Sequence, residues 1–117
     1  MKLWIDDVRL PPDPKEYTWL KYVDEAIAFI EAREQRIKTL NSQGVLSDNR
    51  QKELSVELID LDYDAGSCAR YGGDYIKLLD WLEETGRNYP IRIHSMNPVG
   101  IENMRRIIER NGWTEVK

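Results

Sequence analysis

Residues 56–64 read Val-Glu-Leu-Ile-Asp-Leu-Asp-Tyr-Asp, a short and largely apolar run that ends in closely spaced aspartates. The start of the chain has the same design, because the apolar residues 2–5 are followed directly by Asp6 and Asp7. Short apolar runs of this kind are typical of the doubly buried strands of parallel sheets. We therefore expect 2–5 and 56–61 to be central, neighbouring strands of one parallel sheet.

The rest of the chain predicts strands that alternate with helices. Further strands are expected at 18–23, 91–94 and 113–116, and helices at 25–38, 74–84 and 99–110. This alternation indicates βαβ units, and right-handed crossovers then favour a doubly wound sheet. We expect a single α/β domain over 1–117 with five parallel strands in the order 2-1-3-4-5 and no helix after the last strand. The proline-rich residues 10–15 predict a loop where a first helix would stand, and the polar segment 39–54 an excursion or a ragged helix end.

The amino-acid composition excludes some classes of binding partner for this protein. The formal net charge is −4 over 117 residues, which argues against general DNA or other sequence-blind nucleic-acid binding. No apolar run approaches the roughly 20 residues that cross a bilayer, so no membrane partner is expected. The single cysteine, Cys68, forms no internal disulfide, which favours a reducing compartment and a cytoplasmic location.

Polar residues follow each predicted central strand, at the sheet edge where α/β proteins bind their ligands. They are Asp6, Asp7 and Arg9 after the first strand, Asp62, Tyr63 and Asp64 after the third, and His94, Ser95 and Asn97 after the fourth. Carboxylates brought together repel one another, and a hard divalent cation relieves this. We expect Asp6, Asp7 and Asp62 to bind Mg²⁺ or Mn²⁺. The alternative is that these aspartates are ordinary loop and cap residues.

The other polar residues suggest phosphate chemistry. His94 is a candidate general acid or base, because imidazole exchanges protons near neutral pH; the alternative is a hydrogen-bonded histidine at a strand end. Asn97 opens a predicted helix whose free N–H groups suit an anion, and Ser95 and Arg9 are further candidate phosphate ligands. Plain helix capping by Asn97 is the alternative. Asp62 is a second candidate catalytic residue, as metal ligand or as nucleophile.

Asp6-Asp7, Asp62 and Ser95 resemble the acidic pair, the phospho-acceptor and the hydroxyl residue of receiver domains from two-component signalling, which have a flavodoxin-like fold. A receiver has a helix between its first two strands, where this chain has the proline-rich residues 10–15. A receiver also has a lysine after its fifth strand, for which the terminal Lys117 is a poor substitute. The strings LWIDDVRLPP (3–12), LIDLDYDAG (58–66) and RIHSMNPVGIENMRR (92–106) are more similar to the cyclic-phosphate processing receiver-like family.

That resemblance implies metal-dependent processing of phosphoesters, in particular cyclic phosphates such as 2′,3′-cyclic RNA or nucleotide ends in RNA repair. Relatives usually carry a histidine where this chain has Tyr63, and catalysis here depends on whether that histidine is catalytic in them. Tyr63 and Asp64 are possible accessory residues. The alternative is a non-catalytic receiver-like module that binds a phosphorylated ligand or protein partner. The pair Asp62 and Asp64 also suggests a phosphatase of the haloacid dehalogenase type, but in that family this motif precedes the acidic pair.

Overall fold

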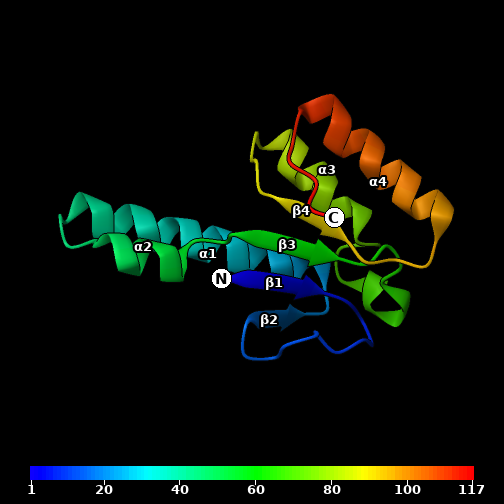
Figure 1. Ribbon diagram of the computed structural model, residues 1–117, viewed down its shortest axis with the longest axis horizontal. Helices are drawn as coiled ribbons and strands as arrows, with labels where there is room; N and C mark the ends of the chain where they lie inside the picture. The colour runs from blue at the N-terminus through cyan, green and yellow to red at the C-terminus, as the bar shows by residue number, and fades with distance from the viewer.

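The computed structural model describes residues 1–117 as a parallel sheet with four α-helices (Figure 1). The strands are β1 (Lys2–Ile5), β2 (Tyr17–Leu20), β3 (Leu58–Leu61) and β4 (Ile91–Ile93), in the order β2-β1-β3-β4. The helices are α1 (Val23–Ser42), α2 (Asp48–Leu54), α3 (Ile76–Glu84) and α4 (Pro98–Asn111), with a short 3₁₀ helix η1 (Gly66–Arg70). The predicted receiver-like α/β architecture is confirmed, and β1 pairs with β3 as expected.

The prediction of a fifth strand is wrong. Residues 113–116 contribute a single parallel bridge, in which Glu115 lies beside Ile91. Only two backbone hydrogen bonds support it, from Ile91 to the carbonyl of Thr114 and from Val116 to the carbonyl of Ile91. The Glu115 carboxylate is 3.0 Å from the guanidinium of Arg105 in α4, so this segment is tied to the helix as much as to the sheet.

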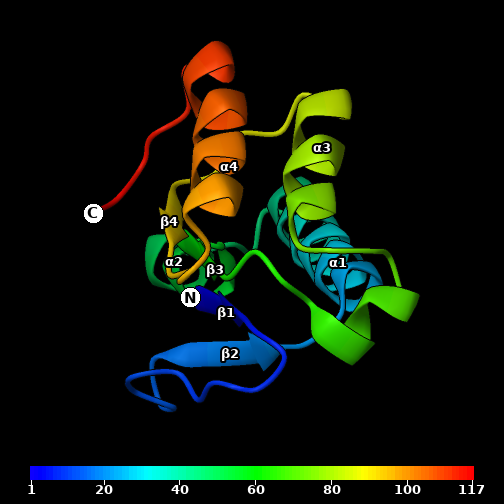
Figure 2. The same cartoon turned by 90° about the vertical axis from the view of Figure 1, so that its right-hand side faces the viewer.

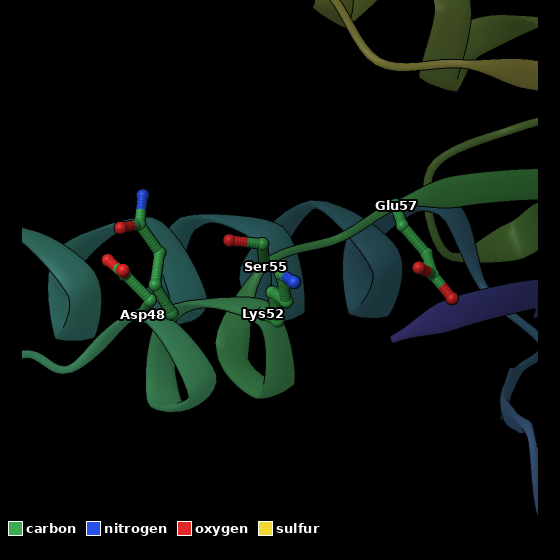
Figure 3. A pocket seen from close by; sticks show the side chains of 5 residues that line it. Asp48, Lys52, Ser55 and Glu57 are labelled. Carbon is green, nitrogen blue, oxygen red and sulfur yellow. The ribbon is translucent and has the colours of Figure 1, made fainter.

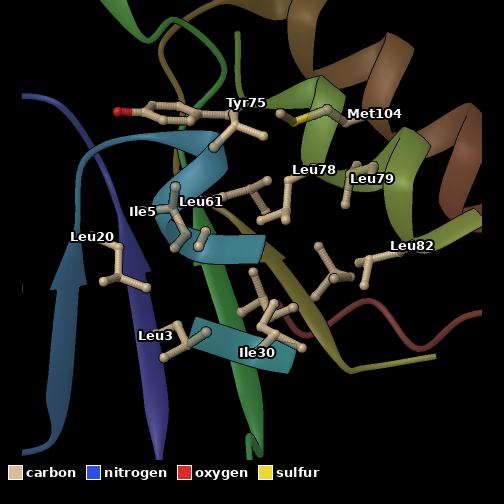
Figure 4. Packing of buried hydrophobic residues seen from close by; sticks show 14 of the residues in the cluster. Leu3, Ile5, Leu20, Ile30, Leu61, Tyr75, Leu78, Leu79, Leu82 and Met104 are labelled. Atoms are coloured by element: carbon tan, nitrogen blue, oxygen red, sulfur yellow. The ribbon is translucent and has the colours of Figure 1, made fainter. Parts of the chain in front are cut away.

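The apolar core lies on one face of the sheet. Alternate strand residues point to it, and strand pairing aligns Leu3 with Ile59 and Ile5 with Leu61. These side chains pack against Ile30 of α1, against α3 and against α4 in one continuous cluster (Figure 4). The other members of this core are Leu20, Val23, Ala26, Val56, Ala65, Cys68, Tyr75, Leu78, Leu79, Leu82, Ile91, Met104, Ile107 and Ile108.

The opposite face of the sheet has no helix, so the predicted doubly wound arrangement is wrong. Figure 2 shows α1, α3 and α4 on the same side of the strands. Residues 6–16, between β1 and β2, form neither helix nor strand, and Pro11 within them is buried. A helix is unfavourable in this segment because three of its residues are prolines. Trp4 and Asp60 lie on this face and are nevertheless buried, at 7% and 1% exposure.

Several element boundaries differ from the predictions. β3 begins at Leu58 and not at residue 56, and α3 begins at Ile76 and not at residue 74. β2 ends at Leu20 and not at residue 23, and α1 begins at Val23 and not at residue 25. The segment 39–54 is mostly helical, because α1 continues to Ser42 and α2 follows, its first turn capped by Ser47. Figure 1 shows α1 and α2 lying side by side and extending beyond the sheet. Polar residues of α2 and of the segment after it, among them Asp48, Lys52 and Glu57, line a pocket there (Figure 3). None of these helices is long and apolar enough to cross a membrane.

Candidate metal and phosphate site

Three carboxylates meet beyond the carboxyl ends of β1 and β3. Asp6, Asp7 and Asp62 each present an oxygen, and these oxygens lie within 4.8 Å of one another. The backbone places them there, because the pairing of β1 with β3 continues past Leu61 through a 3.0 Å hydrogen bond from the Asp62 amide to the Ile5 carbonyl. The structure thus brings together the three residues that the sequence nominated as metal ligands.

The electrostatics of this acidic cluster favour a bound cation. Burial and the charges of Asp6 and Asp62 raise the pKa of Asp7 above its usual value. Burial opposes ionisation of Asp6, but hydrogen bonds from the backbone amides of Arg9 and Val8 and from His94 outweigh it and lower the pKa of Asp6. Oxygen donors with excess negative charge are the ligand set that Mg²⁺ and Mn²⁺ prefer. The donor chemistry of the three aspartates therefore fits such an ion.

The first residue of η1 is a glycine because Asp7 lies close to it. A Cβ atom on Gly66 would stand 2.6 Å from Oδ2 of Asp7, and Gly66 has a φ of +55°. Both the close approach and the left-handed backbone favour glycine. The loop after β3 therefore closes directly over the acidic cluster.

His94 lies behind the cluster, between two carboxylates. Its Nε2 is 2.9 Å from Oδ2 of Asp6, and its Nδ1 is 2.6 Å from Oδ1 of Asp60. The imidazole stacks on Trp4, with ring centroids 3.7 Å apart and planes 3° apart. Direct proton transfer to a substrate requires one of these hydrogen bonds to open, so the acid–base role of His94 stays a prediction.

Asp60 was not among the residues predicted for the site. A usable signal was present, since Asp60 is a charged residue inside an apolar strand and stands two positions before Asp62. Side chains two apart on a strand point to the same face of the sheet. Asp60 is therefore placed on the same side as Asp62, with Trp4 directly beside it in the neighbouring strand.

Two of the three residues predicted to hold phosphate, Ser95 and Asn97, lie at the start of α4. Oδ1 of Asn97 accepts a 3.0 Å hydrogen bond from the Gly100 amide, which caps the helix. The Ser95 hydroxyl accepts from the Asn97 amide at 3.1 Å, and the Asn97 side-chain amide reaches Asp64 at 3.5 Å. Ser95 and Asn97 thus order the helix start, and Asn97 links it to the loop after β3.

Tyr63 and Arg9 border the site, Tyr63 through its packed ring and Arg9 through its backbone. The Tyr63 ring packs on the first turn of α4, where a Cβ atom on Gly100 would lie 2.4 Å from Cγ of the tyrosine. The backbone of Arg9 takes part in the site, because its amide donates to Oδ1 of Asp6 at 2.8 Å and its carbonyl accepts from Nε1 of Trp4. The Arg9 side chain is exposed and forms no ion pair. It is therefore available for an incoming anion.

The strand order, together with the acidic pair after β1 and the aspartate after β3, defines a receiver-type domain. Comparison with protein families narrows this class. The model of the Cyclic-phosphate processing Receiver domain matches residues 1–110, and the chain belongs to this family. No curated protein and no solved structure matches the chain.

Proposed function

We propose that this protein is a metal-dependent phosphoesterase that processes cyclic phosphates, such as the 2′,3′-cyclic ends of RNA or nucleotides. The observation that carries the proposal is the acidic cluster, in which Asp6, Asp7 and Asp62 present oxygens within 4.8 Å of one another. Membership of the cyclic-phosphate processing receiver family supports the substrate class. The lone, buried Cys68 supports a reducing, cytoplasmic setting.

Each residue of the site has a proposed task. Asp6, Asp7 and Asp62 would hold Mg²⁺ or Mn²⁺, and such an ion neutralises phosphate charge and orients the attacking group. Arg9 offers a free guanidinium for non-bridging phosphate oxygens, and Ser95, Asn97 and the start of α4 offer further anion-binding groups. The remaining tasks are catalytic for His94, as proton donor or acceptor, and for Asp62, as ligand or nucleophile. Tyr63 and Asp64 are accessory.

A second function, a module that binds a phosphorylated ligand or protein without turnover, is favoured by two observations. Both ring nitrogens of His94 contact carboxylates, of Asp60 and Asp6, so no free imidazole nitrogen faces the acidic cluster. Tyr63 also stands where relatives usually have a histidine, and a phenol is a weaker acid–base group near neutral pH than an imidazole. A binding module would keep the cation and the phosphate ligands and lack only the proton transfer.

One experiment tests both functions. Purified protein is incubated with Mg²⁺ or Mn²⁺ and a panel of 2′,3′-cyclic nucleotides and cyclic-ended RNAs, and the products are followed by phosphorus NMR. We expect a phosphomonoester from the wild type and from Asp80→Asn, which removes a carboxylate on α3 paired only with Lys77. Asp62→Asn should yield none. Line shifts without conversion would replace the enzyme with the binding module, and unchanged spectra would reject both processing and binding of these cyclic phosphates.

A further inference from the structure

Asp60 carries a charge in a place where strands seldom tolerate one. It lies in the middle of β3 and is 1% exposed. A buried carboxylate is costly unless it is paired and hydrogen-bonded. Its Oδ1 meets Nδ1 of His94 at 2.6 Å, whereas Oδ2 has only a longer, 3.3 Å hydrogen bond from the Tyr17 hydroxyl and an Arg92 guanidinium at 4.0 Å. His94 is therefore the closest hydrogen-bond partner of Asp60.

His94 connects this buried charge to a second one. Asp6 is fully buried, and its Oδ2 meets Nε2 of the same imidazole at 2.9 Å. Each ring nitrogen of His94 therefore lies within hydrogen-bond distance of one carboxyl group. Asp60, His94 and Asp6 thus form a continuous chain of two hydrogen bonds.

Trp4 fixes the plane of the His94 ring within this chain of hydrogen bonds. Its indole is 7% exposed and lies flat against the imidazole, which prevents the ring of His94 from tilting. The indole Nε1 donates to the carbonyl of Arg9 at 2.8 Å, and the amides of Arg9 and Val8 donate to Oδ1 of Asp6 at 2.8 and 2.9 Å. Both oxygens of Asp6 are therefore held, one by the loop and the other by His94.

We propose that Asp60 is a positioning residue, which fixes His94 and through it the orientation of the Asp6 carboxylate at the acidic cluster. The inference rests on the metal site of the proposed function. In many metal centres the histidine is the ligand and a carboxylate orients it from behind, and removing such an outer partner weakens metal binding by about 10–100-fold. Here a carboxylate is the ligand, and the histidine with its second carboxylate stands behind it.

The first test needs no metal. Hydrogen exchange of the Val8 and Arg9 amides reports how firmly Oδ1 of Asp6 is held. We expect Asp60→Asn to speed exchange of both amides about tenfold, while the Asp62 amide, bonded to the Ile5 carbonyl in the sheet, is unchanged. Tyr17→Phe is the matched control, because it removes a hydrogen bond from the other oxygen of Asp60. Unchanged exchange at Val8 and Arg9 in Asp60→Asn would overturn the proposal.

The second test measures affinity for Mn²⁺, by electron paramagnetic resonance of the free ion. Asp60→Asn and His94→Gln should each weaken binding by about tenfold, within the usual range for outer partners. The double variant should bind no more weakly than His94→Gln alone, because Asp60 acts through His94. A purely electrostatic or general folding effect of Asp60 would persist in the His94→Gln background and would overturn the proposal.

The outcomes separate this inference from the proposed function. If the wild type binds Mn²⁺ and Asp60→Asn binds it equally well, the positioning role fails while the metal site stands. If the wild type binds no Mn²⁺, the metal site fails, and the exchange rates at Val8 and Arg9 still decide whether Asp60 orients Asp6. Should Asp60→Asn not fold, His94→Gln provides the same exchange test, since it breaks the same chain of hydrogen bonds.

Discussion

The two faces of the sheet are built from the same strands, but they differ in what covers them and in the side chains that they bury. On the face toward the helices, Leu3, Ile5, Ile59 and Leu61 are fully buried in an apolar cluster. On the other face no helix packs, and residues 6–16 lie where one would stand. That face buries an aromatic ring and two carboxylates joined by an imidazole.

The difference follows from the period of two along a strand. Leu61 faces the helices, while its neighbours Asp60 and Asp62 face the other way, toward His94 and the acidic cluster. Adjacent side chains of one strand can therefore serve different purposes, one packing in the core and the next lying at the candidate site. We therefore expect substitutions on one face of the sheet to leave the other face largely unaffected.

The largest effect is expected on the helix-covered face. Leu61→Ala should lower the free energy of unfolding by about 2–5 kcal/mol, because it removes a fully buried side chain and leaves a cavity. Urea unfolding measures this loss. Affinity for Mn²⁺, determined where the variant is still folded, should match the wild type. A large loss of affinity in Leu61→Ala would show that the two faces are not independent.

The next effect concerns the acidic cluster. At a Mg²⁺ concentration about 100 times its Kd, binding to the native state alone should stabilise the wild type by about 2.7 kcal/mol. Asp62→Asn should abolish most of this gain, and without metal it should raise Tm because one of three mutually repelling carboxylates is gone. Thermal melts with and without Mg²⁺ measure both effects. Asp80→Asn serves as the control, and an equal Mg²⁺ response in Asp62→Asn would contradict the assignment.

A smaller effect tests the boundary between the site and α4. Alanine normally stabilises a helix relative to glycine by about 1 kcal/mol. Gly100→Ala should instead destabilise by about 1–3 kcal/mol, because its Cβ would stand 2.4 Å from the Tyr63 ring and force a shift. Val99→Ala, one residue earlier and exposed, should cost little. Urea unfolding measures the change in free energy of unfolding. A Gly100→Ala variant more stable than the wild type would mean that Tyr63 does not pack on Gly100.

The smallest effect lies on the outside of the helical layer and depends on pH. Burial alone would raise the pKa of Glu34, but hydrogen bonds from Arg87 and Tyr89 outweigh it and lower the pKa. A lowered native pKa contributes stability above the unfolded-state value of 4.5, and this contribution disappears as the pH falls through the native pKa.

Glu34→Gln should therefore cost less than about 1 kcal/mol near pH 7, because the pair is partly solvent-exposed. Its unfolding free energy should converge with that of the wild type in strongly acidic solution. Glu84→Gln, a carboxylate at the exposed end of α3 without an ion pair, is the control. A difference that stays constant with pH would exclude the ion pair as its source.

Much of the site could be predicted because its residues directly follow strands. Asp6, Asp7 and Asp62 come at the ends of apolar runs, and parallel pairing brings such ends to one edge. Asp60 and Trp4 were harder to place. Their role depends on which face each strand turns toward the helices, and a run such as Leu-Ile-Asp-Leu-Asp does not reveal that a tryptophan and a histidine from other strands close over it.

The sequence by itself determined the parallel α/β order, the acidic residues at the strand ends and the cap at Asn97, because all of these depend on local periodicity and side-chain chemistry. Only the tertiary structure decided the number of strands and the coverage of each sheet face. It also decided the partners of His94, whose ring nitrogens bond to residues 34 and 88 positions away in the chain. Contacts over such separations are set by packing and strand register, which no local pattern encodes.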